Sequence, residues 1–298
     1  MKDGFIRVAA ATPDIHVADP QYNSEQIIEL MEQGSARGVK VMAFPELCLT
    51  AYTCSDLFLQ ESLLREAKKE LKRILQASKS KDMILFVGMP WMHKGKLYNV
   101  AAVLNRGRIL GIVPKKHLPN YSEFYELRHF NPGMEKVEMT DWEGVQVPMG
   151  MNLLFACRTM LELVLAAELC EDVWVPCPPS ISHALAGATV IANCSASDET
   201  TGKDQYRYNL ICGQSARLVC GYIYANAGEG ESSQDLVFGG QNIIAENGTC
   251  LVQSDRFKNA CICADLDLGR IISERRRMTT FRDEENRSAS YETVYFEL

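Results

Sequence analysis

The sequence predicts a layered α/β domain built on a mixed β-sheet, and two observations support this prediction. Short apolar runs alternate with segments of helical periodicity in the first part of the chain, as they do where strands and helices alternate. Hairpin signals interrupt this alternation, so antiparallel strand pairs are expected beside parallel ones. No linker divides the chain before residue 278. We therefore expect residues 1–278 to form one domain, followed by a C-terminal tail at 279–298.

The first part of the chain contains the clearest alternation of strands and helices. Apolar residues recur on one helical face of segment 22–37, where Asn23 or Ser24 could cap the start of the helix and Gly38 could end it. Asn105-Arg106-Gly107 is a hairpin signal between two apolar runs. The expected elements are, in order, strand 5–11, helix 22–37, strand 41–44, helix 60–78, strand 83–89 and hairpin strands 97–104 and 108–113.

The rest of the chain continues the mixed pattern after a polar, aromatic-rich segment at 117–132. Glu246-Asn247-Gly248 is a hairpin turn signal between two short apolar runs. The expected strands are 152–155, 161–169, 189–194, 222–227, 241–246, 249–254 and 260–266, and the expected helices are 204–219 and 268–278.

Charge and cysteine usage exclude several classes of function. The net charge of −7 and the pI near 5.4 argue against a nucleic-acid surface, which needs an excess of basic residues. The eleven cysteines are scattered without a Cys-x-x-Cys pair, and the histidines are not spaced with them as zinc ligands, so no metal site is predicted. Several cysteines lie in apolar runs, which favours a reducing cytoplasm, and no apolar run approaches the ~20 residues of a membrane span.

Three predicted strands end in chemically reactive side chains. Strand 41–44 is followed by Glu46, strand 108–113 by Lys115, and strand 161–169 by Cys170. Ligands of open α/β sheets lie outside strand ends, so these groups are expected to converge there. In an acyl transfer, the carboxylate would take the thiol proton and the thiolate would attack a carbonyl carbon. The ammonium, with a nearby backbone N–H, would stabilise the oxyanion.

The residues by themselves leave other interpretations open. A cysteine at a strand end is more often a buried structural residue than a nucleophile. Glu46 and Lys115 could equally be exposed surface residues. A Cys-His hydrolase that uses His117 or His183 as its base is a mechanistic alternative, since spacing does not exclude it.

Three ordered blocks resemble the nitrilase, or carbon–nitrogen hydrolase, superfamily. They are Phe-Pro-Glu46, Pro-Lys115-x-His-Leu-Pro and Cys170-Glu-Asp-x-Trp-x-Pro, in the chain order of that family, and the resemblance covers about residues 5 to 270. It implies an α-β-β-α sandwich of the nitrilase type with mixed sheets. It further implies a Glu46-Lys115-Cys170 mechanism through a thioester, without metal or organic cofactor, and a homo-oligomer.

Further blocks, at 7–13, 45–58, 118–126 and 169–172, are similar to the glutaminase domains of bacterial glutamine-dependent NAD synthetases. This resemblance implies hydrolysis of glutamine to glutamate and ammonia, and an acidic and aromatic substrate pocket. Glu126 has a second interpretation as a carboxylate behind the triad. Loop packing for the aromatic residues and a turn or cap role for Ser197 are the structural alternatives. The implied substrate-binding residues are Tyr121, Phe124, Glu126, Glu171 and Ser197.

The chain departs from full NAD synthetases in one respect: it lacks a Ser-Gly-Gly-x-Asp-Ser phosphate loop. We therefore expect ATP and deamido-NAD to bind only to a separate, ATP-dependent synthetase domain. The aromatic residues near the end of segment 279–298 are expected to pack against that absent neighbour. Two alternatives remain, namely a free-standing nitrilase-type amidase for another small amide and a non-catalytic scaffold.

Overall fold

Two mixed β-sheets pack face to face in this computed structural model, which describes residues 4–233, 235–281 and 290–298. The strand order is β14-β1-β2-β3-β4-β5-β7-β6 in the first sheet and β13-β12-β11-β10-β9-β8-β15 in the second. The first sheet consists of β14 (Cys261–Asp267), β1 (Phe5–Ala11), β2 (Val41–Ala43), β3 (Ile84–His93), β4 (Lys96–Asn105), β5 (Arg108–Pro114), β7 (Val145–Met149) and β6 (Glu138–Trp142). The second consists of β13 (Thr249–Gln253), β12 (Ile243–Glu246), β11 (Gly221–Asn226), β10 (Val190–Ser195), β9 (Val164–Leu169), β8 (Leu153–Cys157) and β15 (Glu292–Phe296).

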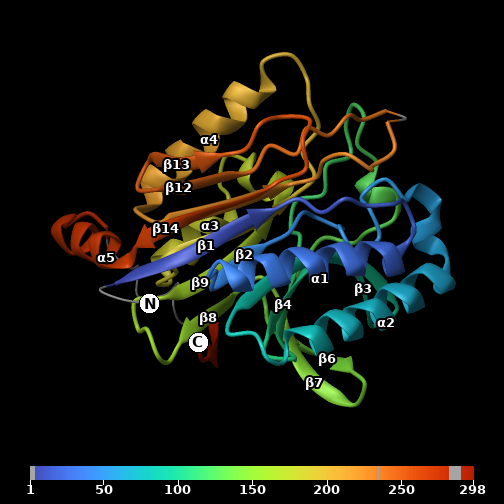
Figure 1. The fold of residues 1–298 in the computed structure, drawn as a ribbon, viewed down its shortest axis with the longest axis horizontal. Coiled ribbons are helices and arrows are strands. Elements are labelled where there is room, and N and C mark those ends of the chain that lie inside the picture. Colours follow the sequence, from blue (N-terminus) through green and yellow to red (C-terminus); the bar gives the residue numbers. More distant parts are fainter. Residues whose placement is uncertain (1–3, 234, 282–289) are drawn as a thin grey trace.

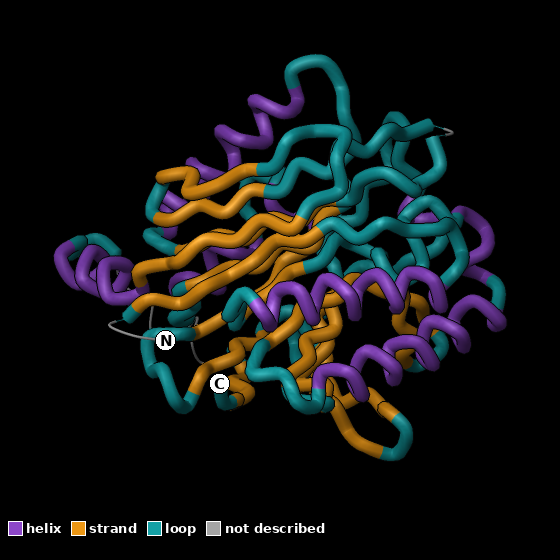
Figure 2. Tube along the Cα trace, viewed as in Figure 1, coloured by secondary structure: helices purple, strands orange, loops and turns teal. Residues whose placement is uncertain are grey.

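Helices cover the outer faces of the two sheets, so the layers are α-β-β-α (Figures 1 and 2). The first sheet packs against α1 (Pro20–Ala36) and α2 (Glu61–Ser78), and the second against α3 (Pro179–Leu185) and α4 (Lys203–Leu218). The sequence of α2 explains its position, because its buried residues recur on one helical face while Lys and Glu occupy the other. α5 (Leu268–Arg277) follows β14. The sandwich predicted from the family resemblance is confirmed.

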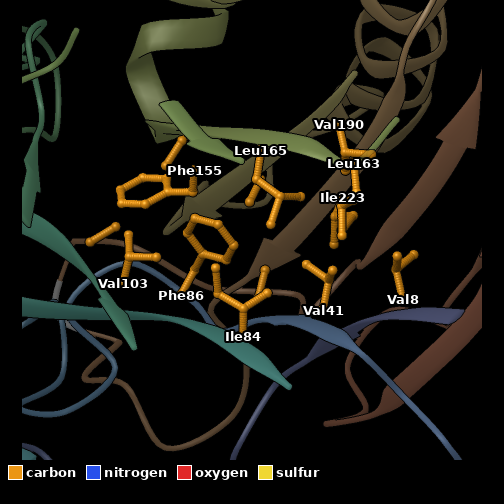
Figure 3. Close-up of a cluster of buried hydrophobic side chains, with 14 of the residues drawn as sticks. Val8, Val41, Ile84, Phe86, Val103, Phe155, Leu163, Leu165, Val190 and Ile223 are labelled. Carbon is orange, nitrogen blue, oxygen red and sulfur yellow. The ribbon is translucent and has the colours of Figure 1, made fainter. Parts of the chain in front are cut away.

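The main core lies between the two sheets (Figure 3). Alternate residues of each strand point into it, because neighbouring side chains of a strand face opposite sides of the sheet. In β1, Val8 therefore lies in the inter-sheet core, whereas Ala9 faces the helices. Phe86 of the first sheet meets Phe155 of the second edge to face, with 6.3 Å between ring centroids.

Most expected elements are present, and the differences have local causes. α1 begins at Pro20 and is capped by the Asp19 carboxylate, which accepts a hydrogen bond from the Tyr22 N–H. The prediction of Asn23 or Ser24 as the cap is therefore wrong. Asn23 is buried inside the helix, where its amide donates to the backbone carbonyls of His16 and Leu49. The β6–β7 hairpin, α3 and β15 were not predicted from the sequence.

The C-terminal segment also differs from the expectation. Instead of packing against an absent neighbour, Glu292–Phe296 forms β15 and pairs in parallel with β8. Phe296 is buried in the inter-sheet core and Tyr295 faces outward. The added strand covers the backbone groups that β8 would otherwise expose at the sheet edge. Residues 282–289 of the predicted tail lie outside the described residues.

None of the helices in the described part of the chain is both long and apolar enough to cross a membrane.

Candidate active site

The ends of β2, β5 and β9 bring Glu46, Lys115 and Cys170 to one point between the sheets. Lys115 and Glu46 are fully buried, and Lys115 Nζ lies 2.6 Å from Glu46 Oε1. Cys170 is also buried, and its thiol lies within the electrostatic influence of both charges. β2 and β5 belong to the first sheet and β9 to the second, so the cluster spans the sandwich.

Glu46 is held by three donors in addition to its position after β2. Its Oε1 accepts from Lys115 Nζ at 2.6 Å and from Asn99 Nδ2 at 2.6 Å. Its Oε2 accepts from the backbone N–H of Ala196 at 3.1 Å, in the segment after β10. Buried charges need such partners, because an unpaired carboxylate in the interior is costly. The carboxylate is therefore fixed in one orientation beside the thiol.

A second carboxylate, Glu126, shares the ammonium of Lys115. Glu126 Oε1 lies 2.6 Å from Lys115 Nζ and accepts a hydrogen bond from the Tyr52 hydroxyl at 2.8 Å. Burial raises the pKa of Glu126 to about 7, although Lys115 acts in the opposite direction. Burial lowers the pKa of Lys115, but Glu126 and Glu46 outweigh burial, and the net effect is upward. Lys115 therefore remains a cation.

Cys170 lies on a strained turn between β9 and the short 3₁₀ helix Cys170–Val173 (η3). Its φ of 38° is in the left-handed region, which non-glycine residues adopt at an energetic cost. Asn193 Oδ1 on β10 accepts from the Cys170 N–H at 3.1 Å. Asp172 accepts from the backbone N–H groups of Leu169 and His117, which ties this turn to the segment after Lys115. Asp172 thus anchors the turn.

The thiol of Cys170 requires a base. Burial, followed by the charge of Glu46, raises its pKa far above the ordinary range, although Lys115 acts in the opposite direction. The resting group is therefore a neutral thiol. Because thiolates, and not thiols, are the effective nucleophiles, proton transfer to a neighbouring group must accompany attack. Glu46 is the carboxylate with the largest electrostatic effect on the thiol.

A cavity of about 400 Å³ opens onto Cys170. The Tyr121 hydroxyl donates to Glu171 Oε1 at 2.9 Å, and the Tyr121 and Phe124 rings meet edge to face at 5.9 Å. Lys203, at the start of α4, pairs with Asp198. The cavity thus combines aromatic walls with a carboxylate and an ammonium. Its lining residues are Tyr121, Glu123, Phe124, Cys170, Glu171, Trp174, Ser197, Thr200, Thr201, Gly202, Lys203 and Tyr206.

The structure brings together four of the five expected substrate-binding residues. Tyr121, Phe124, Glu171 and Ser197 line the cavity, whereas Glu126 lies behind Lys115. The position of Glu126 agrees with its second interpretation as a carboxylate behind the triad. Lys203 was not predicted from the sequence, because a lysine in the first turn of a helix carries no signal that separates it from a solvated one.

The two alternative bases are engaged elsewhere. His117 Nδ1 lies 2.9 Å from Asp172 Oδ1. His183, on α3, lies 2.7 Å from the Tyr291 hydroxyl, and burial lowers its pKa to about 4. The geometry therefore favours Glu46 as the base of Cys170. Among the residues described, no group of three or more His, Cys, Asp or Glu side chains is arranged to hold a metal ion.

The chain is similar in sequence to known proteins over nearly its whole length. The chain is 42% identical over 286 residues to the glutamine-dependent NAD(+) synthetase of Mycobacterium leprae, covering 95% of this chain and 42% of the relative. It is 31% identical over 279 residues to the enzyme of the same name from Aquifex aeolicus, covering 93% of this chain and 45% of the relative. The chain thus spans less than half the length of these relatives.

Solved structures share the fold of this chain, and one protein family matches most of its length. The crystal structure of a glutamine-dependent NAD(+) synthetase from Cytophaga hutchinsonii has a TM-score of 0.79 at 29% identity, over 88% of this chain and 43% of that one. An amidase from Nesterenkonia sp. shares the fold, with a TM-score of 0.70 at 19% identity, over 93% and 97% of the two chains. The family described as carbon-nitrogen hydrolase matches residues 7–276. The chain belongs to the carbon-nitrogen hydrolase family.

Proposed function

We propose that this chain hydrolyses the side-chain amide of glutamine to glutamate and ammonia through a thioester on Cys170, and that the ammonia serves glutamine-dependent NAD synthesis. One observation carries the proposal: the Glu46-Lys115-Cys170 cluster opens onto a cavity that presents both a carboxylate and an ammonium. The names of the relatives supply the identity of the amide, since they are called glutamine-dependent NAD(+) synthetases.

The geometry supports a two-step mechanism. Glu46 accepts the thiol proton while the sulfur of Cys170 attacks the amide carbon. The Lys115 ammonium and a backbone N–H near Glu171 stabilise the tetrahedral oxyanion. When the intermediate collapses, Glu46 returns the proton to nitrogen, and ammonia leaves a thioester on the enzyme. Water, deprotonated by Glu46, then cleaves the thioester to give glutamate and the free thiol.

Specificity is assigned to the two charges at the cavity wall. The Glu171 carboxylate would accept the α-ammonium of a free amino acid, and the Lys203 ammonium would bind its α-carboxylate. Lys203 Nζ is held 5.8 Å from the Phe124 ring centroid and 5.4 Å from that of Trp174, which limits its freedom. A simple amide without the amino-acid end would form neither of these two charge contacts, which is how the site would discriminate against it.

The ATP-dependent step is assigned to a separate synthetase domain, which would bind ATP and deamido-NAD and receive the ammonia. We further propose that the chain forms a homo-oligomer, as the family resemblance implies. We also propose that it works in a reducing cytoplasm, since its eleven cysteines are all free thiols. Light scattering of the purified chain, alone and mixed with an ATP-dependent NAD synthetase domain, would test the assembly. A chain that is monomeric in both samples would contradict this part of the proposal.

The catalytic proposal is tested by measuring ammonia release from glutamine, asparagine and acetamide. We expect release from glutamine, its loss in Cys170→Ala, and an acyl adduct on Cys170 that mass spectrometry detects after acid quenching. Glu171→Gln, which removes the negative charge and keeps the shape of the side chain, should raise KM for glutamine more than it lowers kcat. Activity on acetamide but not on glutamine would favour the free-standing amidase. Full activity in Glu46→Gln would contradict the assignment of the base, and a Cys170 inert to both amides and alkylating agents would favour a scaffold.

A further inference from the structure

A buried chain of hydroxyl groups runs from the nucleophile into the second sheet and ends at a cation that the mechanism above does not use. The Ser195 hydroxyl lies close enough to the Cys170 thiol to lower its pKa, and Ser195 Oγ donates to the Tyr224 hydroxyl at 2.7 Å. The Ser197 hydroxyl lies close enough to Tyr224 to lower its pKa, and Ser197 Oγ accepts from Arg207 Nη2 at 3.2 Å. These residues come from β10, β11, the loop after β10, and α4.

We infer that Tyr224 and Arg207 are positioning residues for the reaction: they act through Ser195 to stabilise the negative charge that develops on the sulfur of Cys170. The inference rests on the proposed role of Cys170 as a nucleophile. It assigns to Arg207 the part of a second cation beside Lys115. Ser195 is the only member of the hydroxyl chain for which direct contact with the reacting sulfur is proposed.

Burial strengthens the electrostatic interactions along this chain of hydroxyl groups. Ser195, Tyr224 and Arg207 are completely inaccessible to solvent, and Ser197 is 2% exposed. Hydrogen bonds and charges interact more strongly in such an interior than at the surface, because little water screens them. A guanidinium at the end of the chain therefore acts on the sulfur across several bonds with little loss to solvent.

The contacts of Arg207 orient its charge toward the hydroxyl chain. Nη1 donates to Glu199 Oε1 and to Gln241 Oε1, both at 2.6 Å, whereas Nη2 donates to the Asp198 carbonyl at 2.8 Å and to Ser197 Oγ at 3.2 Å. The ion pair with Glu199 is thus a fixed dipole whose positive end points at the hydroxyl groups. Burial lowers the pKa of Arg207, whereas negative charge on Tyr224, on Glu199 and, to a smaller extent, on Cys170 would raise it. The guanidinium and the thiol are therefore electrostatically coupled.

A purely structural role gives a weaker account of this arrangement. Replacing a buried ion pair by packed apolar groups is often neutral or stabilising, so a buried arginine is poor evidence of a contribution to stability. The other charged groups that act on the Cys170 thiol are Glu46, Lys115 and Glu126, two carboxylates against one ammonium. These groups together place more negative than positive charge around the growing thiolate. Arg207 supplies the missing positive potential through the hydroxyl chain.

The response to thiol ionisation requires only that the hydroxyl groups rotate. In the resting state Ser195 donates to Tyr224, and the neutral thiol can donate to Ser195. Once Glu46 has taken the thiol proton, Ser195 can turn to donate to sulfur, Tyr224 to donate to Ser195, and Ser197 to donate to Tyr224. Arg207 has no acceptor and donates at the far end in both states. No proton leaves the chain, so the balance of the proposed mechanism is unchanged.

The test is the rate at which iodoacetamide alkylates Cys170, measured between pH 6 and pH 10 and resolved from the other cysteines by mass spectrometry. Tyr224→Phe removes one oxygen and interrupts the chain while keeping the ring. We expect a roughly tenfold slower alkylation at neutral pH, the loss typical of one hydrogen bond to a charged group, and a pH profile displaced to higher pH. Tyr98→Phe, which alters a buried tyrosine of the first sheet, is the matched control and should leave the rate unchanged.

Arg207 is tested by a pair of variants. Arg207→Met should slow alkylation at least as much as Tyr224→Phe does, and Arg207→Lys should recover part of the rate because it keeps the charge. If Arg207→Met does not fold, as judged by its thermal transition, Tyr224→Phe decides the question. Rates and pH profiles of Tyr224→Phe equal to those of the unaltered chain would overturn the inference, and so would equal losses in Tyr224→Phe and Tyr98→Phe.

The alkylation readout is independent of the substrate. A chain that does not hydrolyse glutamine, yet shows the Tyr224-dependent alkylation, would refute the proposed specificity and retain this inference. A chain that hydrolyses glutamine with an unaltered kcat in Tyr224→Phe would retain the proposed function and refute the inference. Where both hold, Tyr224→Phe lowers kcat and leaves KM for glutamine unchanged.

Discussion

Glu168, the buried carboxyl two residues before Cys170, makes the stability of this protein dependent on pH. Its Oε1 accepts from the Tyr222 hydroxyl and its Oε2 from the Ser180 N–H at 2.8 Å. Burial nevertheless raises the pKa of Glu168 from 4.5 to about 7. The folded protein therefore holds this proton to about pH 7, whereas the unfolded chain releases it near pH 4.5.

The sign and size of the effect follow from linkage. Stability from the protonated carboxyl is fully present below pH 4.5 and is lost as pH rises through 7. At about 1.36 kcal/mol per pKa unit, the total loss is about 3 kcal/mol. Between pH 5 and pH 8, most of it is expected to appear, about 2–3 kcal/mol. Glu168→Gln removes this titration and can keep both hydrogen bonds if the Tyr222 hydroxyl reverses its donation.

The assay is urea unfolding of the unaltered chain and of Glu168→Gln at several pH values. The free energy of unfolding of the variant, minus that of the unaltered chain, should rise by about 2–3 kcal/mol from pH 5 to pH 8. Glu162→Gln, an exposed glutamate before β9, is the control and should show a constant difference. A constant difference for Glu168→Gln as well would refute the reasoning, because Glu168 would then titrate alike in the folded and unfolded chains.

Three further substitutions, two of them with a control substitution, test how the site and its sheet are held. Gly88→Ala should abolish activity and cost about 1–3 kcal/mol in urea unfolding, since a Cβ there would lie 2.2 Å from the Pro45 carbonyl oxygen beside the catalytic cluster. Gly213→Ala, with nothing within 4 Å, should instead stabilise α4 by about 0.5–1 kcal/mol. Glu126→Gln should lower kcat for ammonia release roughly tenfold with little change in KM, because Lys115 loses a charged partner; an equal rise in KM would contradict this. Phe296→Ala should lower the free energy of unfolding by about 3–5 kcal/mol, measured by thermal or urea unfolding. Thr293→Ala, at an exposed position of the same strand, should lower it by less than about 0.5 kcal/mol. Equal losses would contradict the packing of β15 on the second sheet.

Local patterns were sufficient to predict most of the strands and helices. The expectation for strand 5–11 matches β1 at both ends, and the Asn105-Arg106-Gly107 signal marks the β4–β5 hairpin. The signals succeed because periodicity and turn chemistry act between residues near in sequence. The prediction of the α1 cap failed because the helix begins at Pro20, directly after Asp19, which caps it. Asn23 instead uses its side chain for buried hydrogen bonds to the backbone.

The residues of the candidate site were likewise only partly predictable from local sequence patterns. The three strand ends predicted the meeting of Glu46, Lys115 and Cys170, since each group lies within three residues of the end of a buried strand. Lys203 and Arg207 carry no such signal. Both lie in the first turns of a helix, where most lysines and arginines are solvated, and only the packing of α4 against the second sheet directs them inward.

By itself, the sequence determined most of the strands and helices, the order of the three reactive blocks and the family to which they point. All of these depend on short-range pattern. The tertiary structure decided which residues share the buried space: Glu126 behind Lys115 instead of in the cavity, β15 on the edge of the second sheet, and Arg207 at the end of the hydroxyl chain from Cys170. These outcomes depend on long-range strand pairing and on burial. Pairing and burial determine which side chains touch and how little water screens their charges, and neither can be read from any single position in the sequence.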